Sequence, residues 1–205
     1  MISRWAVDRT AGWLGVGFLV TLLASEAALS LPDEHTPAAA VATFYAEHRA
    51  VIIILQIVGF ASCALLALFA WRLRSIDRRV ATAGLILAVT ALAPGLITIA
   101  LAIAADPRHS TNANTLNRLE PRGDDMLFIG ITLFAVTVVL LARSPRWIGV
   151  VAASVALTCL LRLVLEALGR PRGFLNSVAP TTFLALVTAL VWLRFRGYPR
   201  GQSAQ

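Results

Sequence analysis

Residues 51–71, VIIILQIVGFASCALLALFAW, decide the fold class of this chain. The stretch contains no charged residue, and its one amide side chain is Gln56. An α-helix needs about 20 consecutive apolar residues to cross the ~30 Å hydrocarbon layer of a bilayer. The stretch therefore predicts a transmembrane helix.

Composition extends this prediction to the whole chain. Hydrophobic residues make up 58% of the 205 positions, charged residues only 14%, and the mean hydropathy is +0.77. These values lie far from those of a soluble domain. Six stretches are long and apolar enough to span, at 10–31, 49–71, 80–105, 125–142, 147–168 and 178–195. The sequence thus predicts an all-α polytopic membrane bundle of six transmembrane helices, forming one domain over residues 1–205.

The arginines predict the orientation of this bundle. On one side of the predicted membrane, the connecting segments carry many arginines and few acids. These arginines are Arg4, Arg9, Arg72, Arg74, Arg78, Arg79, Arg143, Arg146, Arg194, Arg196 and Arg200. By the positive-inside rule both termini are cytoplasmic, in a multi-pass protein of the bacterial inner (cytoplasmic) membrane. A cleavable signal peptide is the alternative for the first segment. The net charge of +7 does not predict nucleic-acid binding, because the basic residues punctuate the apolar segments instead of forming one patch.

Polar residues inside the predicted spans are the best indication of function. Glu26, Gln56, Arg162 and Glu166 interrupt apolar runs, and an ionised side chain in hydrocarbon costs several kcal/mol. Counted from the segment ends at ~1.5 Å per residue, Glu26 and Gln56 lie roughly 10 Å below the outer surface. Arg162, Glu166 and Asp125 lie at or slightly above that level. We therefore expect the four residues inside the spans, Glu26, Gln56, Arg162 and Glu166, to line one cavity that opens toward the outer leaflet.

The spacing of these groups predicts different protonation states. Arg162 and Glu166 are four residues apart, which places them on one helix face and predicts an ion pair. Glu26 has no such partner on its own segment, so it is the expected proton donor. Two alternatives stay open: Arg162 and Glu166 form a packing pair only, or the glutamates extend to the outer interface.

Aromatic residues gather near the same level and, together with Gln56, are the expected substrate-binding residues. The aromatic residues are Phe44, Tyr45, Phe60, Phe128 and Phe183. Ring faces attract positive charge, although core packing explains many such residues equally well. Residues 37–48 have helical spacing and predict either an interfacial helix or an extension of the second membrane helix, which would cover the polar layer. Pro94 and Gly95 predict a bend in the third segment. No histidine or cysteine spacing indicates a metal site.

Three stretches carry a resemblance to known proteins: DRTAGWLGVGFLV at 8–20, LLARSPRWIGVVAA at 140–153 and VWLRFRG at 191–197. In this layout the chain resembles a large group of bacterial six-helix membrane proteins, through motifs that carry no assigned chemistry. In size and helix count it is also similar to small integral-membrane terpene cyclases of actinobacteria, which cyclise farnesylated indole alkaloids such as drimentines. The second resemblance implies that an intramembrane acid, here Glu26 or Glu166, protonates an alkene or epoxide.

Two classes of function follow. The first is a terpene cyclase without metal or cofactor, in which Glu26, Glu166, Arg162 and Asp125 are the catalytic candidates and the substrate is an apolar prenylated molecule or lipid. The second is a proton-coupled transporter or binding protein for a small molecule or lipid. A membrane accessory protein without a ligand is the third alternative.

Overall fold

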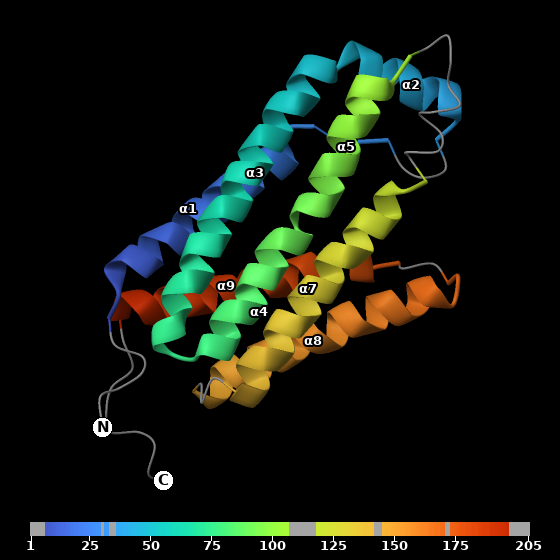
Figure 1. Cartoon of the computed structure of the whole chain (residues 1–205). Coiled ribbons are helices and arrows are strands. Elements are labelled where there is room, and N and C mark those ends of the chain that lie inside the picture. The colour runs from blue at the N-terminus through green and yellow to red at the C-terminus, as the bar shows by residue number, and fades with distance from the viewer. Residues whose placement is uncertain are drawn as a thin grey trace.

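The computed structural model describes residues 7–29, 31–32, 36–106, 118–141, 145–170 and 173–196 (Figure 1). These segments contain helices and no strand. In chain order the elements are α1 (Arg9–Ala27), α2 (Ala38–Glu47), α3 (Arg49–Arg72), the 3-10 helix η1 (Leu73–Ser75), α4 (Arg78–Thr90), α5 (Leu92–Ala104), α7 (Glu120–Leu141), α8 (Arg146–Ala167) and α9 (Leu175–Arg196).

The structure confirms an all-helical chain with six helical stretches that are long and apolar enough to span a membrane. Their mean hydropathy lies between 1.3 and 2.6. Only 17% to 44% of the residues in each stretch are buried inside the protein, so most of the apolar surface faces outward, where a lipid bilayer would cover it. We therefore describe the chain as a multi-pass membrane protein.

Local signals explain where these helices begin and end. The carboxylate of Asp8 accepts a hydrogen bond from the Ala11 N–H at 3.0 Å and caps α1. Gly169, at φ 63°, closes α8 in the left-handed conformation that glycine adopts easily. Helix α7 begins at Glu120, earlier than the predicted residue 125, because Pro121 is tolerated in the first turn of a helix. Residues 107–117, which precede this helix in the chain, lie outside the described residues.

The predicted bend in the third segment is confirmed. One membrane-spanning stretch is divided into α4 and α5 at Ala91, and α4 ends at Thr90. Pro94 has no N–H to donate to the carbonyl of the residue four positions earlier, which is Thr90. The helical bond pattern therefore breaks at the place where the proline removes a donor.

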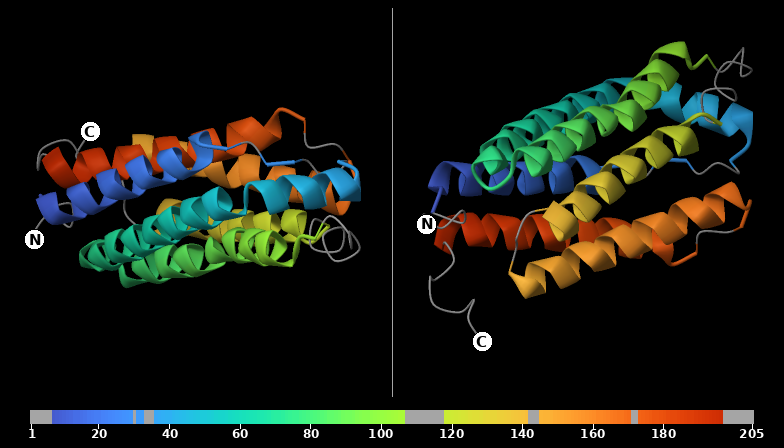
Figure 2. Two further views of the ribbon diagram at one scale, coloured as in Figure 1. Left: turned by 90° about the horizontal axis from the view of Figure 1, so that it is seen from above. Right: turned by 60° about the horizontal axis from the view of Figure 1, so that its bottom comes forward.

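The six spans form a closed ring of neighbours. Contacts run from α1 to α3, from α3 to α4, from α4 to α7, from α7 to α8, from α8 to α9, and from α9 back to α1. Both views of Figure 2 place α1 beside α9. The short helix α2 packs on α3 and α5 at one end of the bundle, which we call the α2 end.

The opposite end, which we call the Asp8 end, is held by a buried arginine. Arg194 is 2% exposed, and its Nη2 lies 3.0 Å from Asp8 Oδ2 and 3.1 Å from Ser75 Oγ. Burial of Asp8 opposes its ionisation, but the hydrogen bonds from Ala11 and Arg194 and the nearby guanidinium outweigh it. The pKa of Asp8 therefore lies below its ordinary value of 3.8. The start of α1 and the end of α9 are joined by this contact.

Candidate functional site

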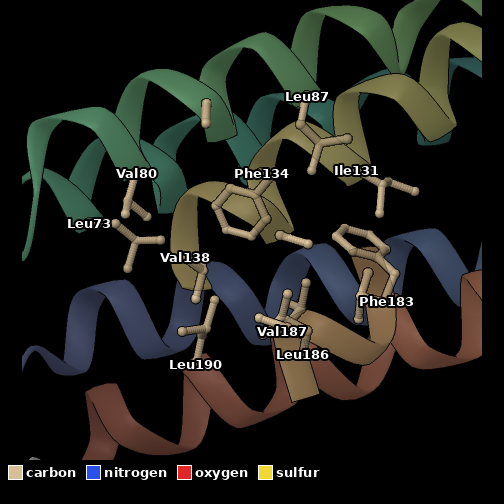
Figure 3. Close-up of a cluster of buried hydrophobic side chains, with 14 of the residues drawn as sticks. Leu73, Val80, Leu87, Ile131, Phe134, Val138, Phe183, Leu186, Val187 and Leu190 are labelled. Atoms are coloured by element: carbon tan, nitrogen blue, oxygen red, sulfur yellow. The ribbon is translucent and has the colours of Figure 1, made fainter. Parts of the chain in front are cut away.

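An apolar cavity of about 730 Å³ lies in the half of the bundle nearer the α2 end. It is bounded by α1, α3, the junction of α4 and α5, α7 and α9, and its wall is mainly aliphatic and aromatic. Leu87, Ile131 and Phe183 belong both to the cavity wall and to the packed core. Figure 3 shows these three toward one side of the buried cluster, and we call them the floor of the cavity because they are shared by its lining and the packed core.

Glu26 is the acid that α1 contributes to this wall. It lies in the last turn of the helix, is exposed, and lines the cavity. Its side chain forms no hydrogen bond and no ion pair with any of the described residues. Leu22, one turn earlier on the same helix, also lines the cavity, so the carboxyl group borders apolar surroundings. Glu26 is thus an acid at an apolar wall without a charged protein partner in the described segments.

Gln56 faces the same space from α3, as predicted. It is half-buried, and its position depends on a close approach of α3 to α5 at Gly95. A Cβ atom on Gly95 would lie 2.8 Å from Gln56 Oε1 and 2.8 Å from Phe60 Cε1. The absence of a side chain at this position therefore allows both Gln56 and Phe60 to occupy the cavity wall beside α5.

Arg162 lies behind the wall and does not line the cavity. Its side chain is 2% exposed, with Nη1 3.2 Å from Asp125 Oδ1 and Nη2 3.9 Å from Asp124 Oδ2. The guanidinium carbon lies 3.8 Å from the ring centroid of Phe128. Asp124 and Phe128 do line the cavity, so the positive charge stands directly behind two residues of the wall. Its Nε is buried and has no hydrogen-bond partner in the described part of the chain.

The predicted ion pair between Arg162 and Glu166 is wrong. Both ion pairs of Arg162 in the described segments run to α7, and Glu166 is half-buried and outside the cavity wall. An (i, i+4) pair on a helix surface contributes only about 0.3–0.5 kcal/mol, which does not compensate a buried guanidinium. The neighbouring helix supplies two carboxylates at that depth. The expectation that four residues line one cavity therefore holds for Glu26 and Gln56 but not for Arg162 and Glu166.

In the first turns of α7, the structure places Asp124 in the cavity wall and Asp125 outside it. Asp125, the predicted catalytic residue, makes the shorter contact with Arg162 and does not line the cavity, whereas Asp124 does. Adjacent positions on an α-helix point about 100° apart, so two consecutive acids that share one neighbour can still differ in whether they line the cavity. The sequence alone does not distinguish them.

Three of the five predicted substrate-binding aromatics line the cavity, namely Phe60, Phe128 and Phe183. Phe18 also lines it and was missed. A signal was present, because residues 18, 22 and 26 follow one another at intervals of four and share a face of α1. Phe18 and Phe183 meet edge to face, with ring centroids 6.3 Å apart.

The other two predicted aromatics, Phe44 and Tyr45, belong to α2 and lie away from the cavity wall. Tyr45 is fully buried in a separate small core with Ile52 and Leu101. Phe44 stacks on His48, with ring centroids 4.5 Å apart. The predicted helix over residues 37–48 is confirmed as α2, but packing against α3 and α5 directs its aromatic face to them.

No group of three or more His, Cys, Asp or Glu residues in the described segments is arranged to hold a metal ion. Comparisons with protein-family models, with curated proteins and with solved structures gave no match for this chain. Its function is therefore inferred from its own residues and their geometry.

Proposed function

We propose that this protein is a membrane-embedded terpene cyclase in which Glu26, in its protonated form, donates a proton to a prenyl substrate. The observation that carries the proposal is an acid without a charged partner in the described segments, bordering an apolar cavity within a membrane-spanning bundle. An ionisable residue at such a place is a functional candidate by default, because keeping it there costs stability.

The cavity suits an apolar ligand of moderate size. Its volume of about 730 Å³ falls within the 300–1,000 Å³ of small-molecule sites. Four aromatic rings border it, from Phe18, Phe60, Phe128 and Phe183. Ring faces can stabilise a carbocation, although the Arg162 guanidinium already occupies one face of Phe128. The remaining rings are therefore the better candidates for this role.

The proposed reaction is an isomerisation that needs no redox partner. The carboxyl proton of Glu26 is transferred to the terminal alkene of the prenyl chain, forming a C–H bond and a tertiary carbocation. The π electrons of the next alkene attack this cation and form the ring C–C bond. Loss of a proton from a neighbouring carbon restores an alkene, and a proton returned to the Glu26 carboxylate completes the cycle.

Asp124 is the proposed acceptor of the final proton or the counter-charge to the cation. It lines the same cavity as Glu26 but has a cation near it, because it lies 3.9 Å from the Arg162 guanidinium. Two acids in such different surroundings can serve as donor and acceptor at one pH. In this proposal Arg162, Asp125 and Glu166 do not touch the substrate.

Proton-coupled transport is the weaker alternative, for a structural reason. A transporter needs its site to reach both ends of the bundle, but the floor of the cavity continues into the packed cluster of Phe134, Val138, Leu186 and Leu190. The arginine pattern of the sequence supports placing both termini in the cytoplasm and the cavity toward the outer leaflet of a bacterial inner membrane.

The decisive experiment compares Glu26→Gln with the unmodified protein in detergent or nanodiscs, using a farnesylated indole and mass spectrometry of the products. We expect product formation to fall by ~100-fold or more, as is usual when a general acid is lost. The matched control is Glu47→Gln, an exposed glutamate on α2 outside the cavity, which should retain activity. Unchanged turnover in Glu26→Gln, or turnover that a chelator abolishes, would refute the mechanism.

A further inference from the structure

A second hollow lies at the Asp8 end of the bundle, distant in the sequence from the proposed acid. It measures about 370 Å³ and is lined by Trp71, Arg74, Arg78, Ala81, Thr82 and Leu85. The first two residues come from the end of α3 and η1, and the others from α4. The hollow therefore lies along the α3–α4 hairpin, where the chain leaves one apolar span and enters the next.

The end of this groove nearest the turn carries positive charge. Arg74 and Arg78 are exposed, and the guanidinium carbon of Arg74 lies 4.3 Å from the ring centroid of Trp71. Asp77, the acid in this turn, accepts a hydrogen bond from the Arg79 N–H at 2.8 Å and is not part of the groove lining. Its carboxylate serves as the cap of α4, so the two groove arginines remain available to an anion.

The other end of the groove is lined by small and apolar side chains. Positions 78, 81, 82 and 85 share one face of α4, and the middle two carry small side chains. The Thr82 hydroxyl donates to the Arg78 carbonyl at 3.0 Å, which satisfies it within the helix. Trp71, which is 49% exposed, and Leu85 also border this part of the groove. An apolar ligand bound there would not deprive a polar side chain of a hydrogen bond.

We propose that this groove binds one anionic phospholipid, with its phosphate between Arg74 and Arg78 and part of an acyl chain against Ala81, Thr82 and Leu85. The basic end and the apolar end follow each other in the order of a phospholipid's headgroup and chain, at the boundary of a membrane span. Arginine clusters at such a boundary attract anionic lipids, and tryptophan favours the headgroup level.

The test uses the chain itself to supply a matched control. Arg74→Gln/Arg78→Gln removes two groove arginines, whereas Arg72→Gln/Arg79→Gln removes two exposed arginines of the same turn that are not in the groove lining. Delipidated protein is titrated with phosphatidylglycerol and, separately, phosphatidylcholine, and binding is followed by native mass spectrometry. We expect the groove variant to lose roughly 30-fold in phosphatidylglycerol affinity and the control variant less than threefold.

Two further experiments distinguish a lipid-binding site from a general attraction of anions to the arginines. Thr82→Phe keeps every charge and fills the apolar end at an exposed position; it should weaken phosphatidylglycerol binding about tenfold. Inorganic phosphate at millimolar concentration should not displace the lipid. Equal losses in the two double variants, unchanged binding by Thr82→Phe, displacement by phosphate, or equal affinity for phosphatidylcholine would each overturn the proposal.

Discussion

Replacing Asp125 by asparagine should destabilise the protein more than the same change at Asp124. The two acids are adjacent on α7 and both lie near the Arg162 guanidinium, but at different distances. Asp125 Oδ1 is 3.2 Å from Nη1, while Asp124 Oδ2 is 3.9 Å from Nη2. Their side chains are 25% and 41% exposed, whereas that of Arg162 is 2% exposed. The guanidinium therefore depends mainly on Asp125.

The magnitude follows from what each change leaves behind. Breaking a buried ion pair by removing one partner costs about 3–5 kcal/mol, because a buried charge loses its compensation. Asp124 would still partly compensate Arg162 in Asp125→Asn, so we expect about half of that, ~2 kcal/mol. Asp124→Asn removes a longer, more solvated pair and should cost less than ~1 kcal/mol. The double variant should show the full loss of about 3–5 kcal/mol.

The assay is reversible unfolding of the detergent-solubilised protein for the four forms, with a rescue as its control. Adding Arg162→Met to the double variant removes the stranded charge and should restore much of the stability, since an apolar side chain of similar length is tolerated at such sites. A larger loss in Asp124→Asn than in Asp125→Asn would refute this account of the site. So would a triple variant less stable than the double.

Three shorter predictions test other parts of the structure. Gly130→Ala should cost about 1–3 kcal/mol, because its Cβ would overlap a threonine hydroxyl and lie 3.1 Å from the backbone of α4; Gly59→Ala, whose nearest neighbour is 3.8 Å away, should be tolerated in the same thermal assay. The pKa of Asp8 is lowered in the folded state, so its contribution to stability is present above its unfolded pKa and is lost as the pH falls through its folded pKa. The Asp8→Asn variant should therefore lack this loss of stability in acid when unfolding is measured over a pH series. The same dependence of stability on pH in both proteins would contradict the assignment. Cys63 lines the cavity and Cys159 is fully buried, so an apolar maleimide should label the former and not the latter, and prenyl ligand should slow the labelling; labelling of both at equal rates would contradict the cavity.

The helical spans could be predicted from the sequence because their signal is local. The length and hydropathy of a run such as 51–71 are enough to predict a membrane-spanning helix, since a helix satisfies every backbone polar group within the segment. The bend at Pro94 is local for the same reason, because the missing N–H removes a bond to Thr90 whatever surrounds it. Helix ends were less well determined, as at Glu120, where a proline in the first turn did not stop the helix.

The depth of polar residues in the membrane could also be predicted from the sequence, and it identified part of the site. Counting residues from the ends of the segments placed Glu26 and Gln56 at one level, and both line the cavity. Depth is a one-dimensional property that follows from a fixed rise per residue along each helix. It does not specify which way a side chain points around the helix, so it could not separate Glu26, at the cavity, from Glu166, outside it.

The pairing of charges was decided only in three dimensions. Spacing along α8 predicted that Arg162 would pair with Glu166, but α7 packs against α8 and presents Asp124 and Asp125 at that depth. In the same way, packing of α2 on α3 and α5 buried Tyr45 in a separate core. Length, hydropathy and proline position act within one segment, so the sequence determined the spans and their depth. The rotation of each helix and its choice of neighbour depend on how all six bury their surfaces together, so the tertiary structure alone decided which acid faces the cavity and which neutralises the arginine.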